Sequence, residues 1–89
     1  MKVNNMARQL KQGEINALEE FQYVWIQFKT RGVYCLQIIG ICKDHNGNVA
    51  FMQFDSPNDY IEVDFARHPF KLWSGQPTDE QIEAVKWDD

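Results

Sequence analysis

The segment Val33–Phe54, VYCLQIIGICKDHNGNVAFMQF, decides the fold. It contains two apolar stretches, 33–42 and 49–54, on either side of the dipeptide Asn46-Gly47. Asn-Gly between apolar stretches is a strong signal for a β-hairpin, because a type I′ turn needs positive φ at both of its central residues. We therefore predict an antiparallel hairpin here. Its first strand is apolar on both faces, which is typical of a central strand that is covered on both sides.

Three further strands are predicted, one before this hairpin and two after it. Side chains alternate with a period of two over residues 22–28 and again over residues 60–65, as is typical of strands. A shorter strand is expected at residues 70–73. Turn-forming residues gather at 30–32 and 55–59. The residues expected to face inward are Val24, Ile26, Phe28, Ile61, Val63 and Phe65.

Helices are predicted at both ends of the chain. Within the first twenty residues, Met6 and Leu10 are four positions apart, and apolar residues continue at a spacing of three after Gly13. Near the other end, Thr78 and Gln81 have the spacing of a capping box, which starts a helix. The predicted fold is α+β, with an N-terminal helix, a four- to five-stranded antiparallel meander sheet and a C-terminal helix. The sheet is expected to be strongly bent or SH3-like.

Length and composition indicate a single domain over residues 1–89. The chain is 44% hydrophobic and 25% charged, an ordinary balance for a globular protein. Its formal net charge is −4 and its nine basic residues are scattered, so we expect no nucleic-acid binding. No apolar run approaches the roughly 20 residues of a membrane span, and no signal-peptide pattern follows Met1. We expect a cytoplasmic protein without membrane contact.

Both cysteines, Cys35 and Cys42, fall in the first strand of the predicted hairpin. Seven residues apart in one extended strand, they would lie about 23 Å apart and on opposite faces. They could not then form a disulfide with each other. In such an apolar strand we expect two reduced and unreactive core thiols.

The residue types that usually carry catalysis form no recognisable constellation. His45 lies in the predicted hairpin turn and His68 in a loop, and no motif places either beside a nucleophile. Glu62 and Asp64 share one strand face, where two solvated carboxylates are a simpler interpretation than a glycosidase pair. The sequence has no zinc spacing, calcium loop or glycine-rich phosphate loop. We therefore expect no enzyme activity, no metal and no cofactor.

Aromatic residues of the predicted sheet are the best candidates for binding. Tyr23 and Trp25 lie on the strand face opposite Val24, and Tyr34 shares a face with Leu36. If a helix covers that side of the sheet, these three aromatic rings are core residues. Otherwise they form an exposed aromatic patch, and Tyr and Trp are among the residue types that dominate binding hot spots. The sequence leaves both alternatives open.

The segment 77–88, with the pattern P-T-x-E-x-I-x-A-x-x-W-D, resembles the C-terminal signature of a family of small phage proteins. Residues 31–36, RGVYCL, are similar to a strand of the same family. The family includes the second type of anti-Thoeris protein, which binds cyclic nucleotide signals of bacterial immunity without cleaving them. The family's Gly-Trp-Asn-Gly-Lys-Gly element is not intact here, and Lys86 stands where an Asp is usual. The residues that the resemblance implies for ligand stacking and phosphate contact are Trp25, Arg31, Tyr34 and Trp87.

Two hypotheses follow for the function. In the first, a phage or mobile element encodes a non-catalytic binding protein that inhibits a host defence factor by stoichiometric protein–protein binding. It would use the aromatic patch and an acidic rim, and the negative net charge favours it. In the second, a homo-oligomer sequesters a cyclic nucleotide immune signal in an apolar pocket between subunits, as the tail signature favours. Across both hypotheses, the candidate binding residues are Tyr23, Trp25, Arg31, Tyr34, Arg67 and Trp87, of which Arg31 or Arg67 would meet phosphate.

Overall fold

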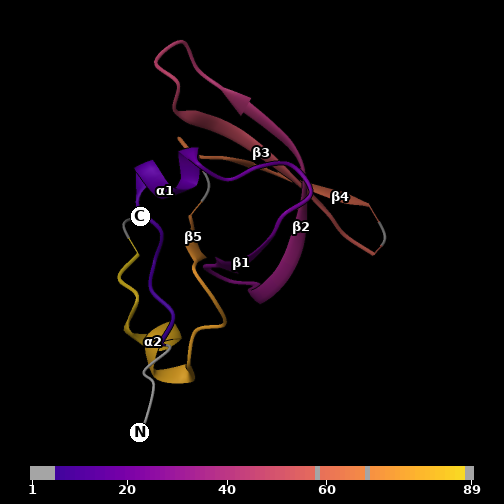
Figure 1. Ribbon diagram of the computed structural model, residues 1–89. Coiled ribbons are helices and arrows are strands. Elements are labelled where there is room, and N and C mark those ends of the chain that lie inside the picture. Colours follow the sequence, from indigo (N-terminus) through magenta and orange to yellow (C-terminus); the bar gives the residue numbers. More distant parts are fainter. Residues whose placement is uncertain (1–5, 58, 68, 88–89) are drawn as a thin grey trace, which may run out of the picture.

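The computed structural model describes residues 6–57, 59–67 and 69–87, and its centre is a curled antiparallel sheet (Figure 1). The strands are β1 (Tyr23–Phe28), β2 (Gly32–Lys43), β3 (Val49–Asp55), β4 (Tyr60–Asp64) and β5 (Phe70–Trp73). Among the described residues, two short helices flank the sheet, α1 (Gln12–Asn16) and α2 (Asp79–Ala84). The strands lie in the order β4-β3-β2-β1-β5. The predicted α+β fold with a strongly bent antiparallel sheet is confirmed at this level.

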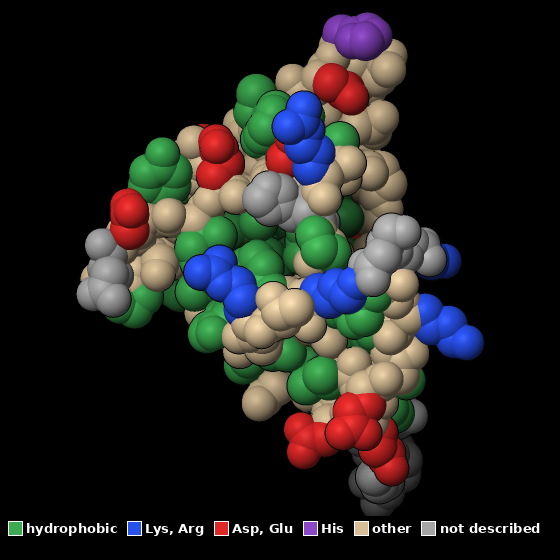
Figure 2. Space-filling model, turned by 180° about the vertical axis from the view of Figure 1, so that it is seen from behind, with side chains coloured by type: hydrophobic (Ala, Val, Ile, Leu, Met, Phe, Trp, Pro, Cys, Tyr) green, Lys and Arg blue, Asp and Glu red, His purple; other side chains and the backbone are tan. Residues whose placement is uncertain are grey.

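The first four strands form the predicted meander, but β5 does not continue it. The chain returns to the far edge of the sheet, where Trp73 pairs with Trp25 and Phe70 pairs with Phe28. The curl of the sheet allows this, because it brings β4 near the far end of β1, where Phe28 and Val63 line one hollow, so the chain can cross from β4 to the edge of β1 within a few residues. Phe65, just after β4, packs edge-to-face on Phe70 with ring centroids 4.9 Å apart. The sheet is therefore a half-barrel, and hydrophobic side chains gather around a hollow on the side seen from behind (Figure 2).

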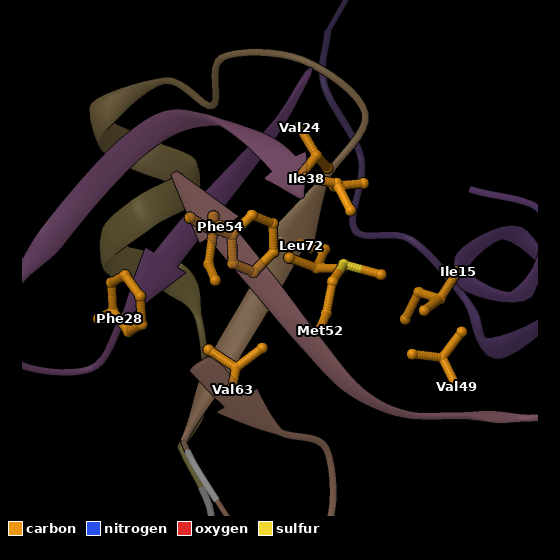
Figure 3. Close-up of a cluster of buried hydrophobic side chains, with 10 residues drawn as sticks. Ile15, Val24, Phe28, Ile38, Val49, Met52, Phe54, Val63 and Leu72 are labelled. Atoms are coloured by element: carbon orange, nitrogen blue, oxygen red, sulfur yellow. The ribbon is translucent and has the colours of Figure 1, made fainter. Parts of the chain in front are cut away.

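The core lies on the concave side of the sheet (Figure 3). The predicted inward residues of β1 are confirmed, because Val24, Ile26 and Phe28 are all buried. Pairing of β3 with β4 places Met52 beside Val63 in the same interior. Burying a large apolar side chain stabilises a fold by about 1.5–3 kcal/mol, so the interior dominates the stability of this sheet. The residues that are fully buried are Ile26, Ile38, Met52, Phe54 and Val63.

The helix predicted over the first twenty residues is wrong except for the short α1. Its residues 1–5 lie outside the described residues. The following segment is extended and pairs with β5: the N–H of Leu10 donates to the carbonyl of Leu72 at 2.8 Å, and the N–H of Ser74 donates to the carbonyl of Arg8 at 2.8 Å. The edge of β5 thus offers backbone partners to this segment, and tertiary pairing of this kind routinely overrides a weak helical pattern.

A β-bulge in β2 changes the face on which the later residues of this strand lie. The register with β3 shifts between Ile38 and Gly40. Because side chains alternate along a strand, one extra residue moves all later side chains to the other face. Cys35 and Cys42 therefore lie on the same face, and both are exposed. The prediction of opposite faces is wrong for this reason. The predictions of core thiols and of a strand covered on both sides are wrong because no described segment covers the side of β2 on which Cys35 and Cys42 lie.

The predicted hairpin between β2 and β3 is confirmed, but its turn is not type I′. Gly47 has a φ of +84°, and its N–H donates to the carbonyl of Asp44 at 3.0 Å. Among the described non-glycine residues only Phe21 has positive φ, so Asn46 does not have it. This geometry is a type I turn followed by a left-handed glycine. The carboxylate of Asp44 favours it, because Oδ1 accepts from the N–H groups of Asn46 and Asn48 at 2.8 and 3.0 Å.

Polar side chains fix both helices to the fold. The predicted capping box of α2 is confirmed, because the N–H of Gln81 donates to Oγ1 of Thr78 at 3.1 Å and the N–H of Thr78 donates to Oε1 of Gln81 at 2.9 Å. Asn16, at the end of α1, accepts the N–H of Val49 at its Oδ1, 2.9 Å away. The first helix is thereby tied to the start of β3, and Ile15 reaches the core beside it (Figure 3).

Candidate binding surface

Within the described part of the chain, the convex side of the sheet, here called the outer face, is covered over β5 and the neighbouring part of β1 and nowhere else. Trp73 projects onto this half of the outer face and is 4% exposed, and Gln27 beside it is 3% exposed. The indole N–H of Trp73 donates to Oε1 of Gln27 at 2.9 Å, and Nε2 of Gln27 donates to the carbonyl of Ile82 at 3.3 Å. Since Ile82 belongs to α2, the C-terminal part of the chain seals this covered half.

The outer face of β2, β3 and β4 has no such cover among the described residues. It carries large apolar side chains in the open, with Ile39 38%, Phe51 39% and Tyr60 55% exposed. We call this surface the open face. A shallow hollow of about 700 Å³ lies on it. The residues that line the hollow are Glu20, Ile39, Gly40, Ile41, Cys42, Phe51, Gln53 and Glu62.

Gly40 has no side chain, which leaves space on the floor of this hollow. The carboxamide of Gln53 lies across Gly40, in the space that a Cβ would occupy. Its Nε2 then donates to Oε2 of Glu62 at 3.1 Å. The glycine that follows the bulge therefore allows a hydrogen-bonded polar row between the apolar side chains of Ile39 and Phe51.

Carboxylates surround the apolar centre of the open face. Glu20 and Glu62 line the hollow, and strand pairing places Asp64 opposite Phe51 on the same face. Arg67 lies 3.6 Å from Asp64 and partly balances its charge. An apolar centre with an acidic rim is complementary to a partner surface that carries Lys or Arg around an apolar residue.

The predicted aromatic residues do not form one patch. The register between β1 and β2 places Trp25 opposite Cys35 on the outer face, but Tyr34 opposite Ile26 on the core side. Tyr23 lies on the outer face, like Trp25. Neither tyrosine is a core residue, because Tyr23 is 67% and Tyr34 is 45% exposed, whereas Trp25 is half-buried. The grouping of these three rings therefore does not hold, and antiparallel register is the reason.

Tyr34 and Arg31 instead meet at a second hollow, at the rim of the half-barrel. The hydroxyl of Tyr34 donates to the carbonyl of Arg31 at 2.6 Å, and the guanidinium of Arg31 lies 5.8 Å from the centroid of the Phe28 ring. This hollow of about 330 Å³ also contacts Leu36 and Ile61. A neighbouring hollow of about 210 Å³ shares Phe28, Arg31 and Ile61. We call the two together the rim groove, and Lys29 and Arg31 are its basic lining residues.

The remaining two candidates lie elsewhere. Arg67 is in the loop after β4, beside Asp64. Trp87 is half-buried, and the Nζ of Lys71 lies 5.9 Å from the centroid of its ring. Lys71 belongs to β5, so this contact lies on the covered half. The six candidate residues are thus spread over the rim groove, the covered half and the loop after β4, and their role in binding stays a prediction.

No protein-family model, curated protein or solved structure matches this chain. The function must therefore be inferred from the surface chemistry. Within residues 6–57, 59–67 and 69–87, no group of three or more His, Cys, Asp or Glu side chains could hold a metal ion. Neither described helix is long and apolar enough to cross a membrane.

One ion pair lies apart from these surfaces and strengthens the N-terminal segment. The guanidinium of Arg8 binds the carboxylate of Glu14, and the N–H of Lys11 donates to the same carboxylate at 2.9 Å. The hydrogen bond from Arg8 is the largest of the effects that lower the pKa of Glu14 to about 2, followed by the hydrogen bond from the N–H of Lys11. The pair holds α1 against the segment that covers the edge of β5, so its role is structural.

Ile39 and Phe51 are not among the binding residues that the sequence predicts. Phe51 sits between Ala50 and Met52 in a strand for which the sequence alone did not distinguish the faces. The exposure of Ile39 depends on the bulge before Gly40, and an isolated glycine in a strand is a weak signal for a bulge. That glycine was the available signal for the open face.

Proposed function

We propose that this protein works without catalysis, as a binding protein whose open face docks on another protein. The observation that carries the proposal is the exposure of Ile39, Phe51 and Tyr60 on one half of a sheet face whose other half the chain covers itself. Large apolar side chains exposed on one face among polar ones mark interaction sites on folded proteins, and here the polar pair Gln53–Glu62 lies between the three apolar side chains. Aromatic side chains in particular supply much of the binding free energy at hot spots.

The acidic rim specifies the chemistry of the partner. Glu20, Glu62 and Asp64 would meet Lys or Arg side chains, which raises the association rate at low salt and selects against acidic partners. The association rate should therefore fall as ionic strength rises, since exposed charges are screened over about 8–10 Å at physiological salt. That the partner is a host defence factor, blocked stoichiometrically in the bacterial cytoplasm by a phage-encoded protein, stays a prediction, in which the family resemblance supports only the phage source.

The test compares one residue of the open face with one of the rim groove. The tagged wild type, Phe51→Ala and Tyr34→Ala are used to capture partners from a bacterial lysate, and binding to the purified partner is then measured by calorimetry. Phe51→Ala should weaken binding by roughly 30-fold or more, the loss typical of a hot spot, with a 1:1 stoichiometry in the wild type. Tyr34→Ala serves as the matched control and should bind like the wild type. Loss of the partner in Tyr34→Ala alone would contradict the proposal.

A second candidate, a sponge for a cyclic nucleotide, is favoured by the rim groove. There Arg31 offers a guanidinium beside the rings of Phe28 and Tyr34, a combination that suits a phosphate next to a planar base. A ligand at about 100 times its Kd should add roughly 2.7 kcal/mol of stability. A thermal-shift screen with cyclic dinucleotides and ADP-ribose derivatives should then raise Tm by several degrees. Arg31→Gln should remove that shift, and a shift that persists in Arg31→Gln would contradict this assignment.

A further inference from the structure

The two edges of the sheet differ in whether the chain covers them. The free edge of β5 is covered by the N-terminal segment, where Gln9 bridges to Trp73 and the carbonyl of Leu72 accepts the N–H of Leu10. The other edge is β4, and no described segment pairs with its outward side. An uncovered strand edge presents a row of unpaired backbone groups, which is a template for pairing with another chain.

The hydrogen bonding of β4 tells which backbone groups point outward. The N–H of Phe65 donates to the carbonyl of Ala50 at 3.0 Å, at the end of the β3–β4 ladder. In an antiparallel ladder, bonded pairs alternate with non-bonded pairs. Ile61 and Val63 therefore bond toward β3, and the N–H groups of Glu62 and Asp64 point to the open side. The carbonyl of Asp64 already accepts the N–H of Arg67 at 3.0 Å. The outward backbone groups that could pair with a further strand are therefore centred on Glu62.

The part of the rim groove that lies beside this edge has a mixed lining. The hollow of about 210 Å³ is lined by the apolar residues Phe28, Ile61, Val63 and Pro69 and by the polar residues Lys29, Thr30, Arg31 and Glu62. A strand that added to β4 would point every second side chain into this hollow, because side chains alternate across a strand. Apolar side chains at those positions would extend the core of the half-barrel.

The other face of the added strand would continue the open face and meet its carboxylates. Side chains directly opposite each other in an antiparallel pair have Cβ atoms about 4.5–5.5 Å apart, so opposite charges there attract and like charges repel. Glu62 and Asp64 therefore select Lys or Arg at the outward positions of the added strand. A second copy of this chain, paired antiparallel about Glu62, would set Glu62 against its own counterpart and is disfavoured.

We propose that the edge of β4 takes up an extended segment of a protein partner in which apolar and basic residues alternate. The segment becomes a sixth strand, its backbone bonds to the outward groups around Glu62, its apolar side chains enter the rim groove, and its basic side chains lie next to Glu62 and Asp64. This inference deepens the proposed function and rests on it, because it identifies the part of the partner that reaches beyond the open face.

The experiment uses the full chain labelled with ¹⁵N and an eight-residue peptide of alternating Lys and Val, with both ends blocked. Binding should slow hydrogen exchange at the N–H groups of Glu62 and Asp64 by at least tenfold and shift their amide resonances. A peptide with Glu in place of Lys should leave both unchanged. A Lys-Val peptide with the backbone nitrogens of its Lys residues methylated keeps the charge but cannot form the ladder, because these are the N–H groups that face β4, and it should also have no effect. Equal binding of the methylated peptide, or protection confined to residues around Phe51, would overturn strand addition.

Two variants separate this inference from the proposed function. Glu62→Pro removes an outward N–H from an edge strand, where proline is tolerated, and should abolish the protection at Asp64. Glu62→Ala keeps that N–H and should retain the protection with weaker binding. If Glu62→Pro does not fold, the methylated peptide still decides.

Sedimentation of the free protein tests whether a second copy of this chain, and not a partner segment, pairs with the edge of β4. A monomer is expected, with rapid exchange at Glu62 and Asp64. A dimer in which these two amides are already protected would assign the edge to a second copy of this chain and overturn the proposal. If Phe51→Ala no longer captures the partner and the wild type does not bind the peptide, the open face remains the proposed binding surface. Only the proposal of strand addition at β4 is then rejected.

Discussion

The covered half and the open face belong to the same side of one sheet, yet their aromatic residues have opposite surroundings. Trp73 on the covered half is buried and hydrogen-bonded to Gln27, whereas Phe51 on the open face projects into solvent beside Glu62. Both residues sit in strands with large outward side chains. What differs is the C-terminal segment, which lies over one half and not over the other. A large outward side chain thus becomes core or contact surface according to what the rest of the chain covers.

The strongest test of this comparison is the free energy of unfolding. Trp73→Ala should lose about 3–5 kcal/mol, the range for truncating a buried aromatic residue, and it also removes the partner of the buried Gln27 carboxamide. Phe51→Ala should lose under about 1 kcal/mol, because its ring is partly solvated and surface changes have small effects. Urea unfolding followed by tryptophan fluorescence or circular dichroism measures both. Similar losses in the two variants would show that the open face is part of the core.

A smaller effect is expected at Phe21, which precedes β1 and exposes its ring. Its φ of +75° is unfavourable for any residue with a Cβ, by roughly 1–2 kcal/mol. Phe21→Gly should therefore be about 1 kcal/mol more stable than Phe21→Ala, which keeps the strain. In ordinary strand or helix positions glycine is the less stable of the two by about 0.5–1 kcal/mol. Denaturant unfolding measures the two variants. If Phe21→Ala were the more stable, the backbone at Phe21 would carry no strain.

The smallest effect is expected at the Arg8–Glu14 pair. The pKa of Glu14 is lowered from 4.5 to about 2 in the folded protein by the hydrogen bond and charge of Arg8. A carboxyl with a lowered folded pKa stabilises the fold above its unfolded pKa, and this stabilisation is lost as pH falls through the folded value. The wild type should therefore lose stability between pH 4.5 and 2 slightly more steeply than Glu14→Gln. Thermal unfolding curves at several pH values compare the two, and parallel curves would show that the pair is not formed in solution.

The features that local chemistry determines could be predicted from the sequence. Alternation located β1 and β4, Asn46-Gly47 located the hairpin, and the spacing of Thr78 and Gln81 located the start of α2. The turn type was missed because Asp44 supplies hydrogen bonds from its side chain. Each correct prediction rests on interactions within a few residues of one another.

The features that depend on distant partners could not be predicted. Pairing of β5 with β1 follows from the curl of the sheet, and the extended segment around Gln9 follows from the free edge that β5 leaves. Prediction of the candidate surface failed in a similar way. One bulge at Ile39 exposes that residue and moves Cys42 to the outer face, and nothing in the alternation of β2 marks where the extra residue falls.

The pairing of the N-terminal segment with β5 also determines the order in which parts of this protein can fold during synthesis. The meander from β1 to β4 contains only neighbouring pairs, so it can form as the chain leaves the ribosome. Residues 8–10 must wait for residues 72–74, more than sixty positions later, and Gln81 must appear before its Nε2 can donate to the carbonyl of Ala7 at 2.6 Å. Until then the edge of β1 and the outer side of Gln27 are uncovered in the nascent chain. Exposed strand edges of incomplete chains are prone to aggregation, so the interval before residues 70–81 emerge is the one in which the meander is most exposed to wrong pairing.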